Sequence, residues 1–226
     1  MRKTITITAI TVLLSLSAAT VHAQQPPTEL LLRMTLQNEM RTGLSQDDVT
    51  TPDVDLQLYG DGENIVVATG TNAYLPRLFF GLCQGPCGLT LRDRNNRFDL
   101  TGRRAKMRVT SIVSAFHEVQ PLIRTGNGTL LVCDRGVGST ADWHQDDISF
   151  SDCRWWRVDG ERGVTLGGSF VDADLTQVEE VGYIDLIPGS GAWEDESLPV
   201  EEQPPPPAGG WIAVSDFEVL GVPVSR

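Results

Sequence analysis

The sequence predicts an all-β protein built as an antiparallel two-sheet sandwich with few or no long helices. Short apolar runs recur along the chain and are separated by turns, which contain many of the 22 Gly and 13 Pro residues. No stretch has the spacing of a long amphipathic helix. Short strands at regular intervals between turn residues are typical of a sandwich or barrel.

The individual strands follow from alternation and turn chemistry. In residues 30–36 every second position is apolar (Leu30, Leu32, Met34 and Leu36), which is strand spacing, although Leu32, Leu36 and Met40 would also line a helix face. Asn127-Gly128 between two apolar runs indicates a hairpin. The expected strands cover residues 30–36, 54–58, 65–68, 78–82, 89–91, 98–100, 105–113, 119–123, 129–133, 148–150, 155–158, 164–166, 178–186 and 211–219.

The first 23 residues have the features of a secretory leader. Arg2 and Lys3 precede an apolar stretch, and Val21-His22-Ala23 ends it with a small residue. The uninterrupted apolar part, residues 9–16, is too short for a membrane anchor. No second apolar stretch follows, so no integral membrane segment is expected once the leader is removed. We expect a secreted or periplasmic protein that begins at Gln24.

Residues 24–226 are expected to form a single β-sandwich domain. At about residues 188–210 the sequence becomes acidic and then rich in proline, with Pro204 to Pro207 in succession. Such a segment buries too little apolar surface to order itself. It is expected to be a long exposed loop inside the domain, because the strand at 211–219 is too short to stand alone.

The chain is acidic, with 30 Asp and Glu against 18 Lys and Arg and a net charge of -12. A negative surface repels phosphate, so nucleic acid is excluded as an expected partner. The basic residues between Arg92 and Arg104 lie among acids such as Asp93 and Asp99. They are expected to form a salt-bridged surface.

Four cysteines follow the leader, and an even number in an exported chain favours disulfides. Four cysteines allow three pairings. We expect Cys83–Cys87, which brackets the turn Gln84-Gly85-Pro86, and Cys133–Cys153. A four-cysteine zinc site is the alternative, but Cys133 and Cys153 are too far apart in the sequence for its usual paired spacing.

Four segments resemble a known fold family. Asp99-Leu100-Thr101-Gly102 and Asp174-Leu175-Thr176-Gln177 each precede a strand, Asp142-Trp143-His144 precedes another, and residues 210–221 close the chain. This order resembles the galactose-binding-like jelly rolls of carbohydrate-binding modules and CIA30-type domains. It also resembles a group of exported bacterial proteins with no assigned activity. The resemblance implies a jelly roll and a carbohydrate ligand; a concanavalin-like sandwich is the alternative topology.

Tryptophans are the first candidates for ligand binding, because an aromatic ring buries the flat C–H face of a sugar while polar neighbours bind its hydroxyls. Trp155 and Trp156 are adjacent, so on a strand one faces the core and the other faces out. Trp143 lies between Asp142 and His144, which could accept or donate hydrogen bonds. The alternative is that all the tryptophans are packing residues.

No nucleophile motif, His-Glu-x-x-His motif or phosphate loop occurs, and no cofactor is expected. A structural calcium ion is the one exception considered. Its candidate ligands are Asp61, Glu63 and Asp216. The resemblance to jelly-roll modules implies such an ion, because these modules often hold one near the chain ends, and calcium prefers oxygen ligands from loops.

Three functions remain open. The first is an exported, non-catalytic β-sandwich that binds carbohydrate or another component of the cell envelope. The second is a carbohydrate-active hydrolase or lyase that uses carboxylates on a concave sheet face. The third is a structural or assembly protein. A tryptophan flanked by two facing carboxylates would favour the enzyme, and a shallow aromatic platform would favour the binding module.

Overall fold

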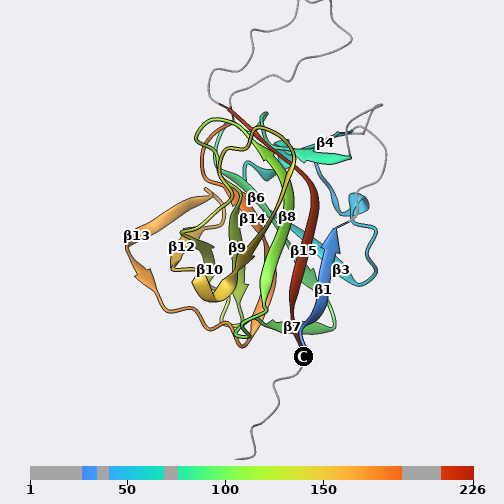
Figure 1. Ribbon diagram of the computed structural model, residues 1–226, viewed down its shortest axis with the longest axis vertical. Helices are drawn as coiled ribbons and strands as arrows, with labels where there is room; N and C mark the ends of the chain where they lie inside the picture. The colour runs from blue at the N-terminus through green and yellow to red at the C-terminus, as the bar shows by residue number, and fades with distance from the viewer. Residues whose placement is uncertain (1–26, 35–40, 69–75, 190–209) are drawn as a thin grey trace, which may run out of the picture.

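The computed structural model describes residues 27–34, 41–68, 76–189 and 210–226 (Figure 1). In these ranges the chain forms β-strands and three short 3-10 helices, η1 (Gln46–Asp48), η2 (Gly62–Asn64) and η3 (Phe150–Asp152). No α-helix occurs in the described ranges, and none of their helices is long and apolar enough to cross a membrane. The predicted all-β class is confirmed.

The strands form two antiparallel sheets. Sheet A contains β1 (Glu29–Met34), β2 (Arg41–Thr42), β4 (Val66–Ala68), β5 (Arg77–Phe79), β8 (Lys106–Val113), β11 (His144–Ser149) and most of β15 (Ile212–Ser225). Sheet B contains β3 (Val54–Gly60), β6 (Cys87–Asp93), β7 (Asn96–Asp99), β9 (Gln120–Thr125), β10 (Leu130–Cys133), β12 (Trp155–Asp159), β13 (Val164–Val171) and β14 (Val178–Asp185). The chain passes repeatedly from one sheet to the other, as in a jelly roll.

Strand β15 connects the two sheets. Its first part pairs with β8 on one side, from Ile212 to Leu220, and with β5 and then β1 on the other. Its last residues, 222–225, pair with β7 of sheet B. Figure 1 shows β15, in dark red, running along most of the length of the molecule.

The main core lies between the sheets and follows from period-two alternation. In β8 every second residue is buried, which places Met107, Val109, Ser111 and Val113 on the inner face. The ring of Tyr183 lies against those of Phe80 and Phe217, with centroids 5.7 and 5.2 Å apart. Such buried aromatic pairs add to the free energy gained from burial alone.

A second apolar cluster covers the outer face of sheet B. It contains Tyr59, Leu122, Leu130, Val132, Val158 and Ile184, with Trp156 and Leu186 packed against them. The turn between β12 and β13 covers part of this cluster. Gly160 in that turn lies against the Tyr59 ring, and its carbonyl oxygen accepts a hydrogen bond of 3.1 Å from the Gly60 N–H. Several strands of sheet B are therefore apolar on both faces.

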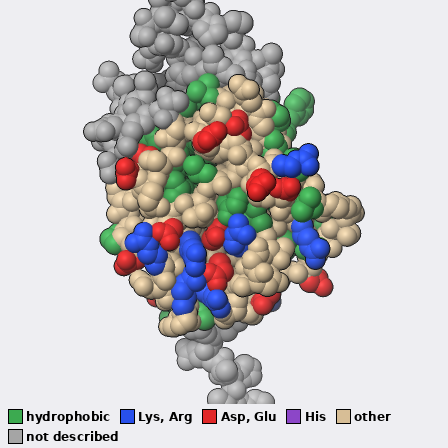
Figure 2. All heavy atoms as spheres, turned by 180° about the vertical axis from the view of Figure 1, so that it is seen from behind, with side chains coloured by type: hydrophobic (Ala, Val, Ile, Leu, Met, Phe, Trp, Pro, Cys, Tyr) green, Lys and Arg blue, Asp and Glu red, His purple; other side chains and the backbone are tan. Residues whose placement is uncertain are grey.

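Three of the arginines expected in a salt-bridged surface are paired with acids: Arg92 and Arg97 with Glu179, and Arg94 with Asp55. Glu179 lies within 4 Å of three guanidinium groups, those of Arg92, Arg97 and Arg226. Burial acts to raise the pKa of Glu179, but Arg226 and Arg97 hold it below its ordinary value. Figure 2 shows basic and acidic side chains lying next to one another on the rear face of the molecule.

Several expectations concern residues outside the described ranges. These are the leader at residues 1–23 and most of the acidic loop at 188–210. The hairpin between β9 and β10 is confirmed: Gly128 has a φ of 85°, which favours glycine, and its N–H donates to Thr125 O.

Two buried tyrosines differ in their hydrogen bonding. Tyr59 donates its hydroxyl proton to Glu180, which also accepts from Thr90 Oγ1 at 2.8 Å and from Arg124 Nε at 3.0 Å. Tyr183 is fully buried, and its hydroxyl has no hydrogen-bond partner among the described residues. An unpaired buried hydroxyl costs free energy, whereas a paired one stabilises the fold.

We therefore expect opposite effects from removing the two hydroxyls. Tyr59→Phe should lower the free energy of unfolding by about 1–3 kcal/mol, because Glu180 loses one of its donors. Tyr183→Phe should leave it unchanged or raise it by up to about 1 kcal/mol. Urea denaturation measures both. An equal loss in the two variants would contradict the assignment.

Alkaline pH should also weaken the fold. Burial, followed by the charge of Glu180, raises the pKa of Tyr59 to about 12. An unfolded tyrosine ionises near pH 10, so the contribution of Tyr59 to stability is complete below pH 10 and is lost as the pH rises toward 12. Thermal melts between pH 9 and 12 should show this decline, and it should be shallower in Tyr59→Phe.

Candidate functional site

Both expected disulfides are present. Cys83 and Cys87 are joined across their turn, with Cα atoms 6.3 Å apart, and Cys133 and Cys153 are joined with Cα atoms 5.2 Å apart. The second bridge links the end of β10 to the residue that follows η3. It therefore fixes the start of β12 relative to β10, although the two strands also pair directly.

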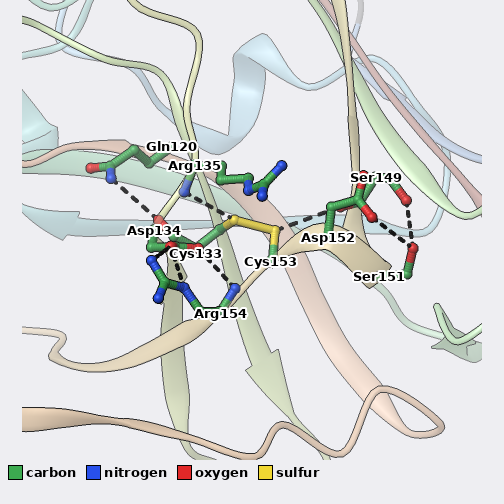
Figure 3. The surroundings of a disulfide bond; sticks show 9 residues. All are labelled: Gln120, Cys133, Asp134, Arg135, Ser149, Ser151, Asp152, Cys153 and Arg154. Carbon is green, nitrogen blue, oxygen red and sulfur yellow. Dashed lines mark hydrogen bonds and ion pairs between the residues drawn. A yellow bond between two sulfur atoms is a disulfide. The ribbon is translucent and has the colours of Figure 1, made fainter.

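An ion pair lies beside this bridge (Figure 3). Arg154 donates its backbone N–H to Asp134 Oδ1 and its Nε–H to Asp134 Oδ2, with a donor–acceptor distance of 2.8 Å in each case. Burial acts to raise the pKa of Asp134, but these hydrogen bonds and the nearby positive charges hold it below its ordinary value. Asp134 thus fixes the guanidinium of Arg154 in one place.

The fixed guanidinium lies over an aromatic pair. Its Cζ atom is 4.2 Å from the ring centroid of Phe170, and the Phe170 and Trp156 centroids are also 4.2 Å apart. Phe170 is 39% exposed and Trp156 is half-buried. We call Arg154, Trp156 and Phe170 the aromatic platform. It combines an apolar surface with a cation over the face of a ring.

A large bulge in β13 presents Phe170. Trp155 pairs with Val171 and Arg157 pairs with Leu166, so residues 167–170 stand opposite Trp156 alone. Gly167, with a φ of 80°, allows the chain to leave the ladder at this point. Strand β12 then directs Trp156 to the outer face, beside Val132 and Val158 of the second cluster.

The structure separates the two adjacent tryptophans, as alternation requires. Trp155 is 4% exposed and belongs to the main core, so only Trp156 reaches the surface. Trp211 immediately precedes β15, is half-buried and packs against Phe79 with centroids 5.7 Å apart.

The other candidate residues lie at the edge of sheet A. Asp142 is exposed and accepts a hydrogen bond from the Trp143 N–H over 2.7 Å, and Trp143 is half-buried. His144 opens β11 and lines a hollow of about 450 Å³. We call this space the β11 hollow. Its wall is formed by residues 135–140 on one side and by residues of 144–152 on the other.

The three calcium candidates do not come together. Asp61 accepts hydrogen bonds from Asn64 Nδ2 and Gln84 N, Glu63 lies in η2, and Asp216 pairs with Arg33 at 3.4 Å. In the part of the chain that the structure describes, no three His, Cys, Asp or Glu residues form a group that could hold a metal ion.

Sequence reasoning missed Phe170, Arg154 and Asp134. The pair Gly167-Gly168, directly after the strand expected at residues 164–166, was the available signal for Phe170, because glycine in or beside a strand often marks a bulge. Asp185 is an acid in the apolar run of residues 183–187. It is buried, and its Oδ2 lies 2.6 Å from Nδ1 of His117.

Comparisons with known proteins give structural similarity alone. No protein-family model and no curated protein matches the sequence. The fold is similar to the family 11 carbohydrate-binding module of the cellulase Lic26A-Cel5E of Clostridium thermocellum, with a TM-score of 0.36, 12% identity and coverage of 76% of this chain and 85% of that one. A family 11 module from the same organism, in complex with a mixed-linked tetrasaccharide, gives a TM-score of 0.34 at 12% identity, with coverage of 86% and 98%.

Loss of the longer bridge should destabilise the fold more than loss of the shorter one. Replacing Cys133 and Cys153 by Ala opens the larger ring and should cost about 3 kcal/mol of unfolding free energy. The matched pair Cys83→Ala and Cys87→Ala opens a much smaller ring and should cost about 2 kcal/mol. Urea denaturation compares them, and a greater loss in the second variant would contradict the expectation.

Proposed function

We propose that this protein is an exported, non-catalytic β-sandwich that binds carbohydrate on the aromatic platform. The observation that carries the proposal is the contact between Trp156 and Phe170 on the outer face of sheet B, with Arg154 over the second ring. Two disulfides among the described residues are typical of an exported protein and support the compartment.

The platform offers the two kinds of contact that a sugar requires. Its rings provide apolar surface for the C–H face of a pyranose, which is worth about 1–2 kcal/mol when buried. Arg154 is 68% exposed, and its contacts with Asp134 use Nε, Nη2 and the backbone N–H. Its remaining N–H groups are therefore suited to hydrogen bonds with sugar hydroxyls.

The carboxylate beside the platform favours binding over catalysis. Asp134 is joined to Arg154 through both of its oxygens, and its lowered pKa keeps it ionised. A general acid needs a raised pKa, and a glycosidase needs two carboxylates across the bound sugar. A shallow pair of rings beside a fixed ion pair instead has the composition of a recognition surface.

Phe170→Ala should weaken binding with little effect on folding. Losing one stacked ring should lower the association constant about tenfold, which corresponds to about 1.4 kcal/mol. Retention on insoluble polysaccharides and calorimetry with soluble β-glucans, xylan and mannan would measure it. Trp156→Phe tests the second ring without emptying the space beneath it.

Phe116→Ala is the matched control, because Phe116 is 88% exposed and lies on the turn between β8 and β9. It should bind as the unaltered protein does. If the polysaccharide panel gives no binding, or if Phe116→Ala weakens binding as much as Phe170→Ala, the proposal fails.

A further inference from the structure

The two disulfides differ in how closely solvent approaches them. Cys83, Cys87 and Cys133 are each 0% exposed, whereas Cys153 is half-buried. The residues on either side of Cys153 are exposed, so this cysteine lies in a surface segment. A thiolate that opens a disulfide must reach one of its sulfurs. Of the four cysteines, Cys153 is therefore the one that an external thiolate reaches most easily.

The bridge within the turn of residues 83–87 is enclosed by its neighbours. Pro86 in this turn lies against Gly163, and Gly189 donates its N–H to the Cys83 carbonyl oxygen in a hydrogen bond of 2.7 Å. Because both cysteines are 0% exposed, an external thiolate cannot reach either sulfur while the turn stays folded.

In the other bridge, the surroundings favour Cys133 as the sulfur that departs. The backbone N–H of Arg135 donates a hydrogen bond of 3.3 Å to Cys133 Sγ (Figure 3). Such a donor stabilises negative charge on sulfur, and the cationic side chains of Arg135 and Arg154 in the same two segments add to this effect. Cys153 Sγ instead lies 3.7 Å from the carbonyl oxygen of Ser149, which disfavours a negative charge there.

Opening this bridge would act directly on the aromatic platform. Asp134 and Arg154 each follow one of its cysteines, and Arg154 is 68% exposed. An ion pair this exposed contributes little by itself, so the covalent link determines how firmly Asp134 holds the guanidinium over Phe170. Trp156 depends on the bridge less, because its own strand β12 pairs directly with β10.

We propose that the Cys133–Cys153 bridge is a redox switch for the aromatic platform, an inference that rests on the carbohydrate binding proposed above. A thiolate of an external dithiol attacks Cys153 Sγ, forms a mixed disulfide with it and expels Cys133 as a thiolate. The second thiol of the reductant then attacks the reductant's own sulfur in the mixed disulfide and releases Cys153. The dithiol ends as a disulfide, and the protein ends with two thiols. The reduced platform keeps Trp156 and loses its fixed cation.

The first test is the site and order of reduction in the folded, unaltered protein. Treatment with glutathione and then N-ethylmaleimide should leave glutathione on Cys153 and maleimide on Cys133. Mass spectrometry of tryptic peptides reads this directly, because cleavage after Arg135 separates the two cysteines. The Cys83–Cys87 bridge should open at least about tenfold more slowly, because its sulfurs are buried.

Urea provides the control for this order, because unfolding exposes both bridges and should make their rates of opening comparable. Glutathione on Cys133, earlier opening of Cys83–Cys87, or a difference in rate that persists in urea would each overturn the proposal.

The second test is retention on polysaccharides before and after a dithiothreitol treatment that opens only the Cys133–Cys153 bridge. Reduction should lower the association constant about threefold, as for the loss of an exposed charged contact, and reoxidation should restore it. The variant with Cys83→Ala and Cys87→Ala is the matched control and should respond in the same way. Circular dichroism follows the fold, and loss of cooperative folding on reduction would overturn the proposal, because the bridge would then be structural only.

The failure of this proposal can be distinguished from the failure of the proposed function. If the oxidised protein binds no polysaccharide, the carbohydrate function is wrong and the switch fails with it. If the oxidised protein binds and selective reduction leaves its affinity unchanged, the redox role alone is wrong.

Discussion

The two sheets are joined through the hydrogen bonds of one strand. β15 pairs with β8, β5 and β1 in sheet A and then with β7 in sheet B, so its backbone sets the register of both layers. Because a strand alternates its side chains strictly, a slip of one residue in β15 would turn Phe217 and Val219 from the core toward solvent. The positions of β8 and β11, and hence of the β11 hollow, follow from this register.

The Cys133–Cys153 bridge has a second, more local role. Asp134 and Arg154, which follow its two cysteines, build the cationic end of the aromatic platform. Arg135 and Asp152 line the β11 hollow from the same short segments. A single covalent link therefore orders side chains on the outer face of sheet B and others at the edge of sheet A.

The fold class could be predicted from the sequence because the patterns that indicate it lie within short segments of the chain. Alternation in residues 105–113, the Asn-Gly turn and the even number of cysteines each depend on neighbouring residues, and each expectation is confirmed. Trp155 and Trp156 were separated by the same rule. The second apolar cluster was harder to predict. Leu122 and Ile123 are adjacent and both buried, on opposite faces of the strand, and an apolar run alone does not show that other residues cover both faces.

The site depended on contacts between distant residues. Asp134 meets Arg154 across 20 positions, and the Trp156 ring meets that of Phe170 on the next strand; no spacing rule predicts such pairs. The platform required the length of the β13 bulge, which Gly167-Gly168 suggests but does not specify. The calcium candidates illustrate the converse: acids that are plausible in sequence were not brought together by the fold.

The bulge in β13 also has a consequence for how these molecules coexist. In the strand order β13 ends sheet B, and a flat strand at an end would offer its backbone to another chain. Residues 167–170 leave the ladder at this point, so a neighbouring strand could not continue the pairing along the whole of β13. The distortion that exposes Phe170 thus discourages edge-to-edge pairing of β13 with a strand of a second molecule.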